Sequence, residues 1–211
     1  MAIQVSGTSV ISDARQLQNI ASLDSTTSAT IGAAAGGGFE FIGETAITTD
    51  TSYIDYTFPT GYKGFKFILN QMCHSDPNAN TYRECRIRLT NSSGTLDTNS
   101  TEYLNANSSR TSMNLSYWWG AGGSNGGYYM GEPSTPKSTL HLEVWNPLDT
   151  DKVTWARGWQ VGHFYINFNQ DYMGENYHAR LSAHKNNGIR FYPAAGQFDS
   201  TMQGYQVWGY K

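Results

Sequence analysis

Basic residues are not in excess in this sequence, and charge of either sign is scarce. Lysine and arginine number 14, aspartate and glutamate number 17, and the net charge is −3. Surfaces that bind DNA or RNA need clustered lysine and arginine to neutralise phosphates. We therefore expect no nucleic-acid partner.

Cysteines and long apolar runs are also scarce. Cys73 and Cys85 are too few for a disulfide framework, so we expect reduced thiols, with a bridge between neighbouring strands as the alternative. No apolar run is long enough to cross a bilayer, and the N-terminus lacks the basic and apolar regions of a secretory signal. We expect a protein made in a cytoplasm, without membrane insertion, that leaves the cell only as part of an assembly.

Signatures of catalysis and of cofactor binding are weak. The cysteines lack C-x₂-C spacing, and the glycine-rich residues 120–127 lack the Lys-Ser/Thr ending of a phosphate loop. Asp149 and Asp151 flank a turn after Asn146-Pro147-Leu148, where aspartate is favoured for its bonds to the backbone. We expect no catalytic residues, no metal and no cofactor.

The composition changes abruptly at residues 32–38, a run of only glycine and alanine. Such small residues bury little apolar area and connect packed units. Residues 1–31 contain no aromatic side chain, whereas the following residues are rich in tyrosine, tryptophan and phenylalanine. The sequence predicts a short attachment segment (1–31), a hinge (32–38) and one large domain (39–211).

The attachment segment is too small to bury its own apolar side chains. Two short strands are expected at residues 2–5 and 9–11, and residues 13–23 form either a short helix or an extended shaft. Its apolar residues need a partner, either copies of the same chain or a docking protein. The anchoring candidates are Ile3, Val5, Val10, Ile11, Leu17, Ile20 and Leu23.

The large domain alternates apolar and polar residues with period two, which is typical of half-buried strands. No convincing helical stripe and no internal repeat interrupts this pattern. We predict an all-β fold, an antiparallel β-sandwich of jelly-roll or immunoglobulin-like type. The expected strands cover residues 52–58, 64–70, 84–90, 139–145, 152–156, 162–168, 177–181, 188–192 and 204–210.

Residues 117–130 place two aromatic clusters around a glycine-rich tip, a composition typical of binding loops. Aromatic rings stack on the apolar faces of sugars, while asparagine bonds to hydroxyl groups. The receptor-binding candidates are Tyr117, Trp118, Trp119, Asn125, Tyr128 and Tyr129. The alternative is that Trp118 and Trp119 pack beneath the loop or between subunits. Trp155 and Trp159 are expected in the core or an interface, and Trp145 lies on the polar face of its strand.

Both ends of the chain resemble virion proteins of tailed phages, especially marine and cyanobacterial ones. Residues 3–20 are similar to the N-terminal segment G-T-x-V-I-x-x-x-R-x-L-x-N-I of tail fibres. Residues 39–45, the Phe-Pro-Thr-Gly-Tyr turn at 58–62 and the ending 202–211 resemble fibre-tip domains, with Val207-Trp208-Gly209-Tyr210 where Leu-Tyr-Gly is commoner. The resemblance implies a homotrimeric structural virion protein with its N-terminus on the tail or baseplate.

We therefore expect a non-enzymatic tail fibre, made in the host cytoplasm and located in the virion. Its partners would be further copies of itself, tail or baseplate proteins, and a glycan or protein of the host cell surface. Two alternatives stay open. A capsid decoration (cement) protein would occupy many positions on the shell, and a glycan depolymerase would release new reducing ends from host polysaccharide.

Overall fold

The computed structural model describes residues 3–5, 8–11, 38–75, 83–97, 103–107, 114–116, 128–131, 137–164 and 170–211. The chain divides into two units, Met1–Gly38 and Phe39–Lys211. Within the described ranges, no helix has the length and hydrophobicity needed to cross a bilayer.

The first unit contains one antiparallel strand pair. β1 (Ile3–Val5) pairs with β2 (Thr8–Ile11), so that Ile3 lies opposite Ile11 and Val5 opposite Thr8. The two expected strands are therefore confirmed. Leu17, Ile20 and Leu23 lie outside the described residues, as does the glycine–alanine run except Gly38. The anchoring role of this unit stays a prediction.

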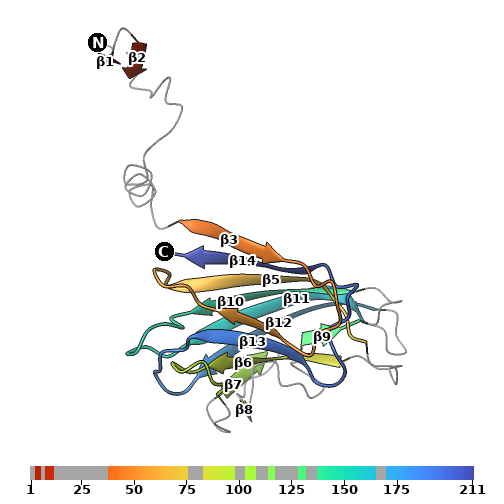
Figure 1. The fold of residues 1–211 in the computed structure, drawn as a ribbon. Helices are drawn as coiled ribbons and strands as arrows, with labels where there is room; N and C mark the ends of the chain where they lie inside the picture. Colours follow the sequence, from red (N-terminus) through yellow and green to blue (C-terminus); the bar gives the residue numbers. More distant parts are fainter. Residues whose placement is uncertain are drawn as a thin grey trace. The chain divides into compact units, whose positions relative to one another are not determined.

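The second unit is an antiparallel β-sandwich, as the alternating pattern predicts (Figure 1). Its described strands form a larger sheet of eight strands and a smaller sheet of four. In spatial order, the larger sheet contains β3 (Phe39–Thr45), β14 (Gly204–Tyr210), β5 (Gly64–Met72), β10 (Ser138–Trp145), β11 (Trp155–Phe164), β12 (Gln170–Arg180), β7 (Tyr103–Asn107) and β8 (Asn114–Ser116). The smaller sheet contains β4 (Ile54–Thr57), β13 (Gly188–Pro193), β6 (Arg83–Thr90) and β9 (Tyr128–Met130).

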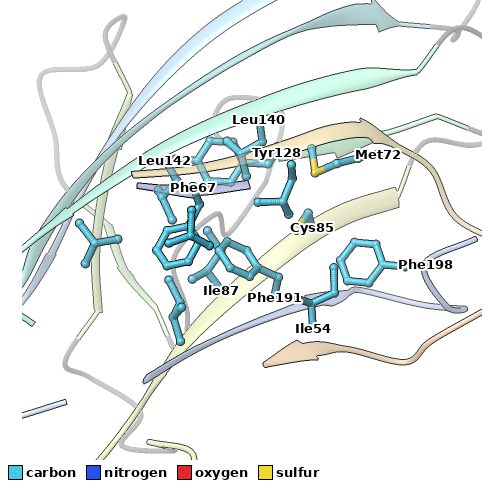
Figure 2. Packing of buried hydrophobic residues seen from close by; sticks show 14 of the residues in the cluster. Ile54, Phe67, Met72, Cys85, Ile87, Tyr128, Leu140, Leu142, Phe191 and Phe198 are labelled. Atoms are coloured by element: carbon cyan, nitrogen blue, oxygen red, sulfur yellow. The ribbon is translucent and has the colours of Figure 1, made fainter. Parts of the chain in front are cut away.

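The core lies between the two sheets and is built from alternate residues of each strand (Figure 2). In β5, Phe65, Phe67 and Leu69 are fully buried, while the residues between them face outward. Burying one such side chain stabilises the fold by about 1.5–3 kcal/mol. Strands β6 and β10 contribute in the same way, with Ile87 and Leu142 among their buried residues.

β11 differs from the prediction, because it runs without interruption where two strands, 152–156 and 162–168, were expected. The glycine at its centre is required by packing. A Cβ on Gly158 would lie 1.8 Å from the Tyr128 hydroxyl oxygen, so only glycine leaves room for that ring. Strands β7, β8 and β9 were not predicted at all.

Both cysteines are free and buried, which confirms the expectation of separate thiols. Cys85 lies in β6, opposite Tyr128 of β9 and Pro193 of β13. Burial raises the pKa of both thiols above the usual range. The interior therefore holds them as small apolar side chains and not as reactive thiolates.

Candidate functional site on the outer face of the larger sheet

The predicted binding loop falls mostly outside the described residues. This applies to Tyr117, Trp118, Trp119 and Asn125. The backbone of Tyr129 lies in β9 opposite Glu84. Their receptor-binding role stays a prediction.

Tyr128 is a correction to that prediction, because its side chain is completely buried in the core (Figure 2). The strand alternation of β9 turns Tyr128 and Met130 inward. A buried hydroxyl needs a hydrogen-bond partner, and the Tyr128 hydroxyl lies 2.6 Å from His178 Nε2 of β12. Burial lowers the pKa of His178 to about 3, so the imidazole is neutral. Tyr128 therefore ties the two sheets together and is not available to a receptor.

The larger sheet carries a second set of aromatic residues on its outer face, besides those of the core. On β3, β14, β5, β10, β11 and β12, the residues between the core positions form a surface of rings and charges. Several of its side chains are well exposed: Phe39 by 45%, Phe41 by 47%, Trp155 by 41% and Tyr177 by 43%. We name this surface the aromatic face and define it by Phe39, Phe41, Lys66, His141, Glu143, Trp145, Trp155, Arg157, Trp159, Glu175, Tyr177, Trp208 and Tyr210.

One row of rings crosses this face near one end of the strands. The Trp145 ring lies 4.3 Å from that of Tyr210 and stacks on Trp155 at 5.5 Å, between ring centroids. Trp155 and Trp145 are opposite each other in the β10–β11 register. On its other side, Trp155 is opposite Ala179 of β12, which offers only a methyl group. The row therefore ends at an exposed tryptophan with little bulk beside it, where the flat side of a ligand can lie.

A second group of side chains occupies the middle of the face. His141 and Trp159 are register partners, and their rings stack with centroids 5.1 Å apart and planes 7° from parallel. Lys66 Nζ lies 5.2 Å from the Trp159 ring centroid and 5.7 Å from that of Phe39. Burial, with a smaller contribution from the Lys66 ammonium, lowers the pKa of His141 and favours its neutral form.

The other charged side chains at the centre are paired within the face. Arg157 forms an ion pair with Glu175, its diagonal neighbour on β12. Glu143 accepts a hydrogen bond of 2.9 Å from the Tyr210 hydroxyl. These pairs fix polar groups between the rings, so the face combines apolar area with hydrogen-bonding groups in set positions.

The expected carboxylate pair has the structural role that its turn suggested. Asp149 Oδ1 accepts hydrogen bonds from the backbone nitrogens of Asp151, at 2.8 Å, and Lys152, at 3.1 Å. These bonds lower the pKa of Asp149. Among the residues that the structure describes, no three histidine, cysteine or acidic side chains form a group able to hold a metal ion.

Trp155 was expected in the core or an interface, and its exposure shows that the core alternative is wrong. Trp145 lies on the polar face of its strand, as predicted, while Trp159 lies half-buried on the same surface. The signal for this surface is the alternation Trp155, Arg157, Trp159 through β11, which becomes visible only when Gly158 is taken as a strand residue. Comparison of the chain with protein family models, curated proteins and solved structures finds no match.

Proposed function

We propose that this chain is a structural virion protein, a non-enzymatic tail fibre of tailed-phage type. Its N-terminal segment attaches to the tail or baseplate, and its sandwich domain recognises a glycan on the host cell surface. The observation that carries the proposal is the aromatic face. An outer sheet face rich in exposed rings is unusual for a domain that contacts only water.

The arrangement of this face fits a sugar ligand. Sugar rings have apolar C–H faces, which pack on aromatic rings, and hydroxyl groups at their edges, which need polar partners. The exposed Trp155 ring supplies the aromatic surface. Arg157, two residues further along β11, and its ion-pair partner Glu175 supply the polar groups. The central part of a subunit interface is usually depleted of charge, whereas this face carries charges among its rings.

The separate first unit supports the attachment part of the proposal. A short strand pair has little core of its own and gains stability by packing against a larger assembly. Several copies on one particle, as in the homotrimer that the sequence resemblance implies, would strengthen a weak single site by avidity.

The test is binding of the full chain to immobilised lipopolysaccharides and capsular polysaccharides from marine bacteria and cyanobacteria. Trp155→Ala and Trp159→Ala should each weaken binding about tenfold or more, since central aromatic residues dominate such surfaces. The matched control is Tyr53→Ala. Tyr53 is 46% exposed and lies under the Arg190 guanidinium, beside the smaller sheet, so its removal should leave binding unchanged.

Four results would overturn the proposal. The full chain could bind none of the polysaccharides, or the tryptophan variants could bind as well as the unchanged protein. New reducing ends in the incubated polysaccharide would identify a depolymerase. A map of the intact particle with this chain on the capsid shell would identify a decoration protein.

A further inference from the structure

Lys66 stands out on the aromatic face as a cation that has no carboxylate partner among the residues that the structure describes. It lies at the centre of the face on β5, opposite Trp208 of β14 and Glu143 of β10. Within the described residues, no acidic side chain forms an ion pair with it. The nearest acidic neighbour in register, Glu143, is engaged with the Tyr210 hydroxyl.

The surroundings of Lys66 hold its ammonium in place. The rings of Phe39 and Trp159 both lie within cation–π distance of Nζ. Aromatic rings also remove water from around the ammonium, and an incoming anion then has less water to displace. Lys66 is therefore a positioned, partly dehydrated positive charge among surfaces suited to sugar rings.

We infer that the aromatic face recognises an acidic polysaccharide and that Lys66 binds one of its anionic groups. A carboxylate or sulfate group of the chain would meet Lys66 Nζ, while a neighbouring sugar ring packs on an exposed ring such as Trp155. This inference rests on the proposed function and adds the charge class of its ligand.

The same charge argues against a two-fold contact with a second copy of this chain as the occupant. In a two-fold contact, a surface meets the same surface of its partner. A contact centred on the aromatic face would bring two Lys66 ammonium groups close together, while Glu143 and Glu175 of the face are already engaged with Tyr210 and Arg157. An acidic polysaccharide brings the missing negative charge.

The test compares polysaccharides that differ only in charge. The probes are polygalacturonate against its methyl ester, and dextran sulfate against dextran, with binding to the full chain measured by calorimetry. The acidic member of at least one pair should bind about tenfold more tightly, since a charge-assisted bond is worth more than one tenfold step in affinity. Raising the salt concentration should weaken the acidic complex and leave neutral binding unchanged.

Three variants test whether Lys66 causes the preference for the acidic probe. Lys66→Met keeps most of the apolar stem and should abolish the preference for the acidic probe, whereas Lys66→Arg should retain it. Arg88→Met is the matched control, because Arg88 is a cation near the Tyr192 ring, on the outer side of the smaller sheet. It should leave the preference intact, and thermal unfolding of each variant checks its fold.

The outcomes separate this inference from the proposed function. The acidic and neutral probes could bind equally well, with this binding lost in Trp155→Ala. That result would overturn the inference of an acidic ligand and leave the proposed glycan recognition intact. An acidic preference that survives Lys66→Met would also overturn the proposed role of Lys66. A full chain that binds no polysaccharide overturns both. Loss of self-association in Trp155→Ala would assign the face to a subunit contact and reject the inference.

Discussion

Replacing Gly158 with alanine tests the packing that joins the two sheets. The added Cβ would lie 1.8 Å from the Tyr128 hydroxyl oxygen and 2.5 Å from Cζ. Real carbon atoms do not approach so closely, so the Tyr128 ring must move. Because that ring is fully buried, it has no solvent-filled space to move into.

The cost has two parts. Overpacking a core by one methyl group costs about 1–3 kcal/mol. Displacing the hydroxyl also breaks its hydrogen bond to His178, which costs about 1–3 kcal/mol inside a protein. Gly158→Ala should therefore lower the free energy of unfolding by about 2–6 kcal/mol.

Urea unfolding followed by tryptophan fluorescence measures this loss. Gly43→Ala is the matched control, because nothing lies within 4 Å of the Cβ that it would add, and its effect should stay within about 0.5 kcal/mol. Tyr128→Phe removes the closest contact, so the double variant with Gly158→Ala should lose less than the sum of the two single losses. A Gly158→Ala protein as stable as the unchanged one would refute the buried position of Tyr128.

Three further predictions concern buried groups. His178 is neutral in the fold and binds a proton more readily when unfolded, so stability should fall by about 2 kcal/mol between pH 7 and pH 5. His178→Gln should flatten that loss in urea unfolding across this range, and an unchanged slope would contradict it. Cys73 and Cys85 should not react with Ellman's reagent until denaturant is added; rapid reaction in the folded protein would count against their burial. Arg180→Met removes the buried ion pair between Arg180 and Asp97 and should cost about 3–5 kcal/mol in the same assay, while a loss below about 1 kcal/mol would argue against a buried pair.

The sandwich was predictable wherever alternate residues differ clearly in polarity. In residues 84–90, Cys85, Ile87 and Leu89 are buried, while Arg86 and Arg88 point the other way, as the pattern indicates. Turn chemistry was predictable for a similar reason. Asn91 Oδ1 accepts hydrogen bonds from the backbone nitrogens of Ser93 and Thr95, which are local in sequence.

The strands that were missed depend on distant partners. β7 reads Tyr-Leu-Asn-Ala-Asn, which is too polar to show a core face, and it is a strand because it pairs with β12. Tyr128 was misassigned because aromatic residues suit both binding loops and cores. Its register opposite Cys85 decides between the two, and no local pattern contains that information.

The position of β3 has a mechanical consequence. β3 is the outermost strand of the larger sheet beside residue 38, and among the described strands only β14 pairs with it. A pull along the backbone from the first unit enters the domain at Phe39, so the β3–β14 hydrogen bonds bear the load before any other strand pair. Peeling β3 away would take Phe39 from Lys66 and Phe41 from Trp208. Under the proposed function, a pull on the chain before Phe39 would therefore weaken glycan binding, because the β3–β14 hydrogen bonds hold part of the aromatic face in place.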